Sequence, residues 1–352
     1  MIVNGQPYRT VWMEGPTVRL INQPLLPHFF EIADLPDHRA TAGAIRDMVV
    51  RGAGAIGATG GYGVAQVALE APDGPGFMDY IRQGAATLAS TRPTAQNLFY
   101  AIERVQRAVE GAGSVKAARQ AAVETAQAVA DEDAASCEAI GRHGSALLRD
   151  GMRMLTHCNA GWLAFVDWGS ALAPVYAARR QGKKVFVYAD ETRPRGQGSQ
   201  LTAWELVNEG IPHAVVADNA SGFLMQRGEI DLAIVGSDRI AANGDVANKI
   251  GTYEKAVIAH ELGIPFYVAA PTSTVDPKCP NGQEIPIEER SPDEVLYAYG
   301  LLDNGQLGRV RVAPQESTAR NLAFDVTPAR YITGIITQNG IFKPQDILKA
   351  LK

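Results

Sequence analysis

The spacing of hydrophobic and polar residues changes near residues 40 and 150. Before residue 40, strand-like runs at 8–13 and 17–21 flank the turn signal Glu14-Gly15-Pro16 and predict a short β unit. From residue 40 to about 149, apolar residues recur at steps of three and four, which predicts helices. Ser114 is the expected N-cap of a long amphipathic helix in this part of the chain.

After Asp150-Gly151, short apolar runs typical of strands alternate with segments typical of helices. This alternation predicts a parallel sheet with right-handed crossovers. We therefore expect the α/β class, with a mostly helical N-terminal domain at residues 1–145 and a C-terminal α/β domain at 146–352. The expected strands are 152–158, 184–189, 213–217, 232–236, 265–270 and 331–337, and the expected helices are 162–181, 198–209, 220–227, 252–263 and a short C-terminal one.

Polar residues directly follow the first five of these strands. In an open parallel sheet, ligands gather beyond the carboxyl ends of the strands. Helix N-caps account for part of this polarity, but a scaffold without a ligand would not need so polar an edge. A ligand site is therefore expected at this edge. The residues are Cys158-Asn159, 190–193, Asp218-Asn219, Ser237-Asp238-Arg239 and 271–273.

Composition restricts the function classes. A length of 352 residues favours two domains, and 46% hydrophobic with 20% charged residues is ordinary for a globular protein. A net charge of −5 disfavours a general nucleic-acid binder, which needs a basic surface. The N-terminus lacks the features of a signal peptide, and no apolar run approaches the roughly 18 residues of a membrane helix. We expect a cytoplasmic protein with neither nucleic acid nor membrane as a partner.

Cysteine and histidine usage argues against disulfides and metals. Cys137, Cys158 and Cys279 are widely spaced and odd in number, so a disulfide framework is not expected. None of the six histidines pairs with a second histidine, a cysteine or a carboxylate at a recognised zinc-ligand spacing. The compartment is expected to be reducing, and no metal is expected.

Residues 51–57, Arg-Gly-Ala-Gly-Ala-Ile-Gly, contain a literal G-x-G-x-x-G. A dinucleotide site needs a preceding buried strand, but 40–50 reads as a helix. A phosphate cradle fits better, with backbone N–H groups at a helix start and the Arg51 guanidinium binding the anion. Arg92-Pro93 precedes a second helix start, with Pro93 near the first helical position, and offers a second cation. A small-residue helix contact with Arg51 in a surface ion pair is the alternative.

Cys158 and Asp238 are the candidate catalytic residues. Cys158 follows a strand and precedes a predicted helix, whose N-terminus would favour the thiolate. Asp238 follows an apolar strand, and an acid in apolar surroundings can keep its proton and act as a general acid. The alternatives are an inert core cysteine and a helix N-cap.

The segment 243–251 contains Asn243-Gly244-Asp245 and then Asn248-Lys249. It reads as a loop with a lysine and several amide groups, suited to an anion or to sugar hydroxyls. A solvated turn explains it equally well.

Taken together, these segments resemble the methylthioribose-1-phosphate isomerase family of methionine salvage. That family has a small N-terminal domain joined to a Rossmann-like C-terminal domain, is usually a homodimer, and uses no metal or nucleotide cofactor. Residues 191–194 read Glu-Thr-Arg-Pro and 201–206 read Leu-Thr-Ala-Trp-Glu-Leu. The matching stretches run in order along nearly the whole chain: 51–57, 92–95, 156–161, 189–206, 236–245, 248–252, 285–290 and 321–328.

The resemblance implies an aldose–ketose isomerase that converts 5-methylthioribose 1-phosphate to 5-methylthioribulose 1-phosphate. It implies that Asp238 is the proton donor and that Cys158 is a catalytic partner or a transition-state stabiliser. In that mechanism, Asp238 protonates the ring oxygen and hydrogen reaches C1 from C2, either as hydride or through an enol. The implied substrate contacts are Arg51, Gly52, Ala53, Arg92, Gln197, Asn248 and Lys249.

Two departures from the family bear on substrate choice. Gly54 stands where the family often has proline, which should loosen the phosphate loop. Residues 162–168 are bulkier than the small residues common there, and are expected to narrow or dry the pocket.

Three rivals remain. The first is an isomerase of ribose 1,5-bisphosphate or 5-deoxyribose 1-phosphate. The second is a regulatory subunit of the exchange factor for translation initiation, which shares the fold but should lack the Cys158 and Asp238 pair. The third is a dinucleotide-dependent oxidoreductase.

Overall fold

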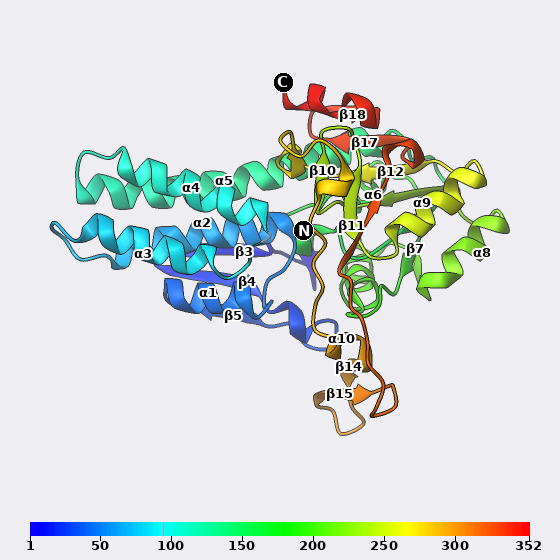
Figure 1. Cartoon of the computed structure of the whole chain (residues 1–352), viewed down its shortest axis with the longest axis horizontal. Helices are drawn as coiled ribbons and strands as arrows, with labels where there is room; N and C mark the ends of the chain where they lie inside the picture. The colour runs from blue at the N-terminus through cyan, green and yellow to red at the C-terminus, as the bar shows by residue number, and fades with distance from the viewer. Residues whose placement is uncertain (94) are drawn as a thin grey trace. The chain divides into compact units, whose positions relative to one another are not determined.

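The computed structural model describes every residue except Thr94, and the chain forms two compact units. Unit 1 comprises Met1–Cys137 and Trp162–Gly169, and unit 2 comprises Glu138–Gly161 and Ser170–Lys352. The predicted class is confirmed: the fold is α/β, with a small N-terminal part and a large, mainly parallel sheet in the C-terminal part (Figure 1). The predicted boundary at residue 145 stays a prediction.

Unit 1 begins with short antiparallel strands. The predicted β unit is confirmed, since β3 and β4 pair antiparallel across the predicted turn, with Val11 opposite Leu20. Burial alternates along β4, which places Val18 and Leu20 in the core. The strands are β1 (Ile2–Val3) with β2 (Gln6–Pro7), and the sheet β3 (Val11–Glu14), β4 (Thr17–Ile21) and β5 (Ile32–Leu35).

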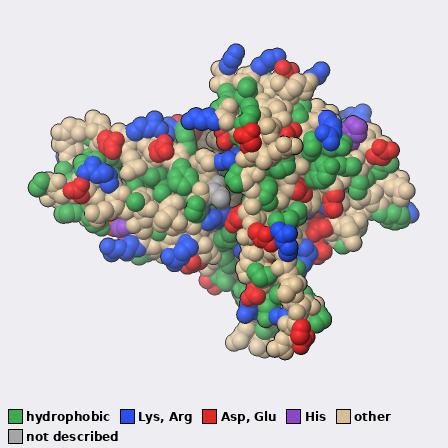
Figure 2. All heavy atoms as spheres, viewed as in Figure 1, with side chains coloured by type: hydrophobic (Ala, Val, Ile, Leu, Met, Phe, Trp, Pro, Cys, Tyr) green, Lys and Arg blue, Asp and Glu red, His purple; other side chains and the backbone are tan. Residues whose placement is uncertain are grey.

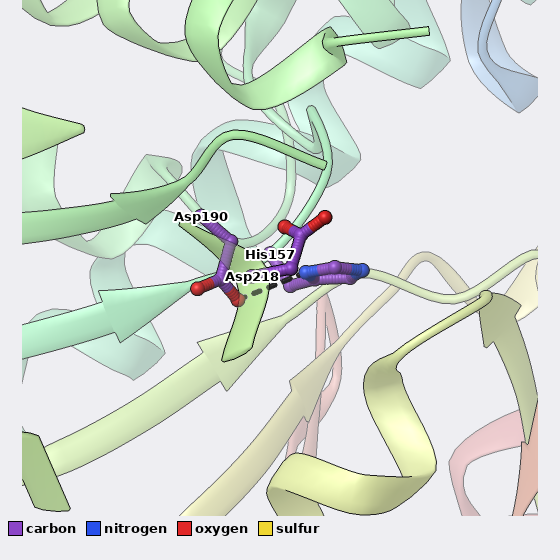
Figure 3. A group of neighbouring side chains, drawn as sticks. All are labelled: His157, Asp190 and Asp218. Atoms are coloured by element: carbon purple, nitrogen blue, oxygen red, sulfur yellow. Dashed lines mark hydrogen bonds and ion pairs between the residues drawn. The ribbon is translucent and has the colours of Figure 1, made fainter. Parts of the chain in front are cut away.

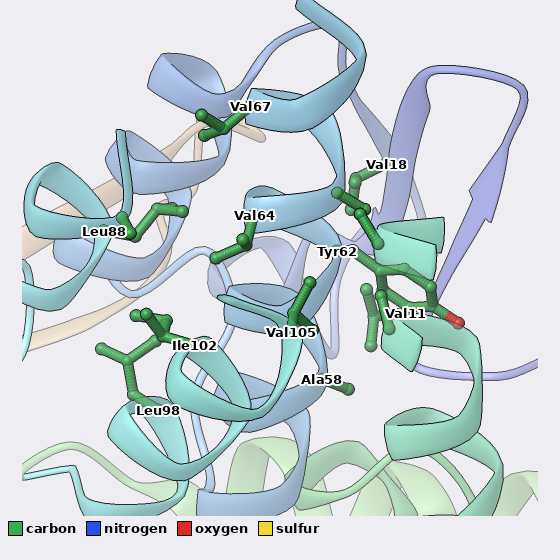
Figure 4. Close-up of a cluster of buried hydrophobic side chains, with 14 of the residues drawn as sticks. Val11, Val18, Ala58, Tyr62, Val64, Val67, Leu88, Leu98, Ile102 and Val105 are labelled. Carbon is green, nitrogen blue, oxygen red and sulfur yellow. The ribbon is translucent and has the colours of Figure 1, made fainter. Parts of the chain in front are cut away.

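Helix α2 (Ala53–Glu70) is the centre of unit 1 and is buried along most of its length. It packs on the neighbouring helices and on β3 and β4, and Figure 4 shows Val64 of α2 among Leu88, Leu98 and Ile102. A Cβ at Gly60 would lie 2.4 Å from Leu98, so glycine permits this close approach. The other helices are α1 (His38–Arg46), α3 (Phe77–Ala89), α4 (Gln96–Glu110) and α5 (Val115–Ser145), which continues into unit 2.

The N-termini of α5 and α4 can be compared with the helix starts predicted from the sequence. Ser114 Oγ accepts a hydrogen bond from the Ala117 N–H at 3.2 Å, which confirms it as the cap of α5. The position predicted for Pro93 is wrong: α4 has Ala95 as its N-cap, and a turn in which the Ala95 N–H bonds to the Arg92 carbonyl comes first. Thr94 lies outside the described residues.

Unit 2 contains a seven-stranded sheet in the order β18-β17-β12-β9-β6-β7-β8. All neighbours are parallel except the β17–β18 pair, and the predicted strands are confirmed as the Rossmann-like core. Leu232–Val235 is buried throughout, as expected for a central parallel strand. The strands are β6 (Arg153–Thr156), β7 (Phe186–Asp190), β8 (His213–Val216), β9 (Leu232–Val235), β12 (Phe266–Ala269), β17 (Gly334–Thr337) and β18 (Gly340–Phe342).

The helices of unit 2 are shorter than predicted. Of the predicted 162–181, only α6 (Ala173–Arg180) is an α-helix, because Trp168 and Gly169 both have positive φ and interrupt the segment. Residues 198–209 begin as a π-helix, Gly198–Thr202, before α7 (Ala203–Asn208). The others are α8 (Ser221–Gln226), α9 (Thr252–Glu261), α10 (Asp293–Leu296) and the C-terminal 3₁₀ helix Pro344–Leu351.

Unit 2 also contains a second sheet and a hairpin. The second sheet has the order β13-β10-β11-β16, with only β13 and β10 parallel. Helix α10 is followed by the antiparallel hairpin of β14 and β15. The strands are β10 (Arg239–Ala241), β11 (Val246–Lys249), β13 (Val275–Asp276), β14 (Tyr297–Leu301), β15 (Leu307–Arg311) and β16 (Phe324–Thr327).

The surface is that of an ordinary acidic globular chain. Across the described residues, every helix is too short or too polar to cross a lipid bilayer. Figure 2 shows acidic and basic side chains interspersed over the visible face.

Candidate functional site

The order of the large sheet defines where a ligand is expected in unit 2. From β6 the chain adds β7 and β8 on one side, then crosses to add β9 and β12 on the other. The crevice at such a reversal, beyond the carboxyl ends of the two central strands, is the usual ligand position in this architecture. Cys158 follows β6 and Asp238 follows β9, so the two predicted catalytic residues both lie at this reversal.

The backbone at Cys158 is held in a rarely used conformation. Its φ is +65°, in the left-handed region that residues other than glycine seldom adopt. The Cys158 N–H donates to Thr192 Oγ1 at 2.8 Å, and its carbonyl accepts from Thr202 Oγ1 at 2.7 Å. These two threonines fix the position of the half-buried thiol.

The expectation that a helix N-terminus acts on Cys158 is wrong. The next α-helix, α6, begins only at Ala173. Between them lies a single 3₁₀ turn, Trp162–Ala164, which belongs to unit 1. The dipole of a three-residue turn is small, so the environment of the thiol is set by the threonines and by nearby charged groups.

Asp238 does not have the apolar surroundings that its strand suggested. The strand is buried, but the Asp238 side chain is exposed, and the residue lies between β9 and β10, so it is not a helix N-cap. Its N–H donates to the Ala247 carbonyl at 2.9 Å. Lys249 and Arg290 lie within electrostatic reach of it. Asp238 is therefore an exposed side chain with two cationic neighbours.

Lys249 and Asn248 lie on β11, where both are buried, so a solvated turn is wrong for them. Lys249 Nζ donates to the Ala323 carbonyl at 2.9 Å and lies 4.6 Å from the centre of the Phe324 ring. Burial lowers the pKa of Lys249, and the nearby Cys158 opposes that shift. A buried ammonium group beside Cys158 and Asp238 is suited to an anion or to developing negative charge.

The side-chain oxygen of Gln197 is a buried hydrogen-bond acceptor that a donor on a ligand could satisfy. The residue is the N-cap of the π-helix Gly198–Thr202 and its side chain is buried. Among the described residues, Gln197 Oε1 has no hydrogen-bond partner. A buried acceptor without a donor costs about 1–3 kcal/mol. A ligand hydroxyl at this position would remove that cost.

Arg51, Gly52 and Ala53 stand at the N-terminus of α2 in unit 1. Gly52 is the N-cap with φ +93°, and Ala53 is the first helical residue. A Cβ at Gly52 would lie 2.4 Å from the Ala164 Cα, so only glycine fits. No strand directly precedes this glycine among the described residues, since α1 ends at Arg46, and a dinucleotide fingerprint therefore lacks its context.

Arg92 and Arg51 lie at the same end of unit 1. Helices α2 and α4 pack together, and a Cβ at Gly57 would lie 3.0 Å from the Asn97 carbonyl. Gly57 is in the first turns of α2 and Asn97 is at the start of α4, so the two N-termini are neighbours. Arg51 and Arg92 precede these two starts. Arg51 Nε donates to Gln23 Oε1 at 3.2 Å, so its guanidinium group is held near the start of α2, where the helix N-terminus favours an anion.

Close packing explains why residue 54 is a glycine. A Cβ there would lie 2.3 Å from Asp133 Oδ1 and 2.6 Å from the Phe165 ring. Asp133 is buried on α5 and accepts a hydrogen bond from the Val166 N–H at 2.7 Å. The space that a proline would fill at this position is thus taken by the Asp133 carboxyl group and Phe165.

Sequence reasoning missed a buried polar network beside Cys158. His157 Nδ1 lies 2.9 Å from Asp190 Oδ2 (Figure 3). His157 Nε2 lies 2.8 Å from the Ile250 carbonyl oxygen. Burial raises the pKa of Asp190, while the hydrogen bond from His157 opposes the rise. Lys255 Nζ lies 3.5 Å from the same Asp190 oxygen. The strand-end position of Asp190 was a signal for this site, but its partners were not visible in the sequence.

His157, Asp190 and Asp218 have potential metal ligands within 4.8 Å of one another. Most of their ligand atoms are engaged in hydrogen bonds, and Asp190 Oδ1 is the exception among the described residues. Asp218 accepts from the Thr192 and Arg193 N–H groups, both at 2.7 Å. His157 Nε2 faces a carbonyl, which only accepts, so that nitrogen carries hydrogen and has no lone pair for a metal. The group fits a hydrogen-bond network better than a metal centre.

Glu205 and Arg290 are two further residues that the sequence did not single out. Glu205 is fully buried, and its carboxylate accepts from Asn159 Nδ2 at 2.7 Å and from the Tyr176 hydroxyl at 2.6 Å. Arg290 lies 5.4 Å over the Phe324 ring and is paired with Glu288 at 3.1 Å. Both lie in stretches that carried the family resemblance, which was the available signal.

Comparison with known proteins gives consistent results. Residues 49–344 match the model of the Initiation factor 2 subunit family. The chain is 50% identical to methylthioribose-1-phosphate isomerase of Gluconobacter oxydans, over 97% of this chain and 95% of that protein. The structure of 5-methylthioribose 1-phosphate isomerase from Pyrococcus horikoshii matches with a TM-score of 0.88 and 42% identity, covering 98% and 96%. Translation initiation factor eIF-2B subunit delta from A. fulgidus matches with a TM-score of 0.86 and 40% identity, covering 97% and 98%.

Proposed function

Since this chain belongs to the Initiation factor 2 subunit family, we propose that it converts 5-methylthioribose 1-phosphate to 5-methylthioribulose 1-phosphate in methionine salvage. The observation that carries the proposal is the placement of Cys158 and Asp238 at the reversal of strand order, with the buried Lys249 within electrostatic reach of both. The relatives that carry this activity in their names cover nearly the whole chain.

Residues of unit 1 are suited to binding an anion such as a phosphate group. Arg51 and Arg92 supply guanidinium groups, and Gly52 and Ala53 supply backbone N–H groups at the start of α2. Charge-assisted hydrogen bonds of this kind contribute roughly 1.5–3 kcal/mol each.

Residues of unit 2 are suited to binding sugar hydroxyl groups. Gln197 Oε1 accepts from a hydroxyl group, which supplies the donor that this buried oxygen needs. Asn248 and Lys249 donate from β11, where burial strengthens their hydrogen bonds. Lys249 also stabilises negative charge that develops on the sugar oxygens during the reaction.

A phosphate on the anomeric oxygen prevents simple opening to a free aldehyde, so ring opening needs acid catalysis. Asp238 delivers a proton to the ring oxygen as its bond to C1 breaks. Hydrogen then moves from C2 to C1, and the C2 hydroxyl loses its proton to become the ketone. Cys158 receives or relays a proton in this second stage. Because Asp238 is exposed in this structure, its role as an acid requires substrate to displace the water around it.

We also propose a homodimer that works in the cytoplasm. All three cysteines are free thiols, as a reducing compartment permits. The homodimer follows from the resemblance to the isomerase family, and size-exclusion chromatography with light scattering tests it.

An assay of the purified protein against three sugar phosphates tests the proposed function. We expect turnover of 5-methylthioribose 1-phosphate with a kcat/KM well above those for ribose 1,5-bisphosphate and 5-deoxyribose 1-phosphate. Preference for one of the other two would assign the chain to a sister isomerase. Absence of turnover on all three would favour a regulatory role like that of the initiation-factor relatives.

A further inference from the structure

His157 is a buried histidine with both ring nitrogens in use. Its side chain is 1% exposed and that of Asp190 is 0% exposed. Nδ1 lies 2.9 Å from Asp190 Oδ2 and Nε2 lies 2.8 Å from the Ile250 carbonyl oxygen. The ring thus bridges the end of β7 and the turn that follows β11.

The bridge fixes where the protons lie. A carbonyl oxygen only accepts, so Nε2 carries hydrogen and donates to Ile250. On the other side, His157 Nδ1 and Asp190 Oδ2 share one proton, and Lys255 Nζ is 3.5 Å from the same oxygen. A buried carboxyl group is retained only with partners of this kind.

His157 and its hydrogen-bond partner Ile250 are each adjacent along the chain to a residue of the proposed site. On the chain, His157 precedes Cys158 and Ile250 follows Lys249. The turn after Lys249 is held from another side as well, since Asp325 accepts from the Gly251 N–H at 2.7 Å and from the Tyr253 N–H at 3.1 Å. A Cβ at Gly251 would lie 3.2 Å from the His157 ring, so the turn packs directly on the imidazole.

We propose that His157 is a positioning residue for catalysis: its Nε2 donates to the Ile250 carbonyl and thereby holds Cys158 and Lys249 at a fixed separation. This inference rests on the proposed function. The hydrogen bond to Ile250 is the one that contributes to catalysis, and the hydrogen bond to Asp190 orients the imidazole ring.

Two substitutions of His157 separate its hydrogen bond to Ile250 from its contact with Asp190. In His157→Gln the side-chain amide reaches the position of Nε2 and keeps the donor to Ile250. In His157→Asn the amide reaches the position of Nδ1, keeps the Asp190 contact and loses Ile250. Since misplacement of a reacting group by about 1 Å costs on the order of 100-fold in rate, we expect kcat to fall about 100-fold in His157→Asn and less than about tenfold in His157→Gln. KM should stay within about twofold in both.

His213→Asn is the matched control. His213 is on β8 of the same sheet, and its Nδ1 also contacts a backbone carbonyl, that of Ile211, at 2.8 Å. It should leave kcat and KM unchanged. The proposal is overturned if His157→Asn keeps kcat within about threefold, or if His157→Gln falls as far as His157→Asn.

A readout independent of turnover separates this inference from the proposed function. We would measure the rate at which iodoacetamide alkylates Cys158, by mass spectrometry of its peptide. The rate should change in His157→Asn and stay near wild type in His157→Gln and His213→Asn. Equal rates in all four proteins would overturn the positioning role. If the four proteins show these alkylation rates but wild type does not turn over the sugar phosphate, the proposed function is overturned and the positioning role of His157 is not.

Discussion

Asp133 is a buried carboxyl group on α5 whose ionisation should make unit 1 less stable as pH rises. Burial is the largest cause that raises its pKa from 3.8 to about 7, and the hydrogen bond from the Val166 N–H opposes the rise. The folded state therefore holds a proton that the unfolded chain releases at a lower pH. Stability is highest below the unfolded pKa and falls as pH rises toward the folded pKa.

The size of the effect follows from the two pKa values. Each pKa unit corresponds to about 1.4 kcal/mol, so a shift from 3.8 to about 7 amounts to roughly 4 kcal/mol between pH 4 and pH 8. Asp133→Asn removes the ionisable group, and the amide oxygen still accepts from Val166. The variant should lose the downward slope between pH 5 and pH 7, and should be the more stable protein at pH 8.

Urea unfolding of wild type and variant at pH 5, 6, 7 and 8 measures this difference, with the midpoint reported at each pH. Asp131→Asn is the control, because Asp131 is an exposed residue of the same helix whose partner is Arg9 at the surface. We expect its curve to run parallel to that of wild type. If the Asp133→Asn curve is also parallel to wild type over this range, Asp133 does not titrate as a buried acid.

Three further predictions concern the proposed site. Arg51→Ala and Arg92→Ala should each raise KM by about tenfold or more, since a charge-assisted bond is worth roughly 1.5–3 kcal/mol; if both keep the wild-type KM, the phosphate binds elsewhere. Cys158→Ser should lose nearly all activity. In the wild-type reaction run in deuterated water, deuterium at C1 of the ketose would indicate an enol route, whereas full retention of the C2 hydrogen would indicate hydride transfer. Gly52→Ala should lower the midpoint of thermal unfolding, because its Cβ would lie 2.4 Å from the Ala164 Cα; an unchanged midpoint would contradict the close packing at the start of α2.

The alternation of strands and helices after residue 150 was predictable, because buried parallel strands are short apolar runs bounded by turn residues. The same pattern failed for 162–181. The apolar residues before α6 are buried but do not form an α-helix, since Trp168 and Gly169 have positive φ and the Val166 N–H bonds to Asp133. Contacts with distant parts of the chain decide the conformation of such a segment, and periodicity does not record them.

The candidate site was predictable in outline. Position after a strand identified Cys158 and Asp238, because carboxyl ends of parallel strands share one edge. The strand order that makes these two ends neighbours was not predictable, since it depends on crossovers and pairing. His157 was missed for the same reason: its partners Asp190 and Ile250 are 33 and 93 residues away in the sequence. The exposure of Asp238 likewise depends on where the side chain projects beyond its apolar strand.

The proposed chemistry depends most directly on Asp238. The measurement is turnover of 5-methylthioribose 1-phosphate by wild type and by Asp238→Asn, followed by carbon NMR of the ketone signal at C2, with circular dichroism to verify that the variant is folded. Because a general acid contributes about 100-fold to 10,000-fold in rate, we expect the ketone to accumulate with wild type and kcat to fall at least about 100-fold in the folded variant. A folded Asp238→Asn protein that turns over within about tenfold of wild type would contradict proton donation by Asp238 at the reversal of the sheet.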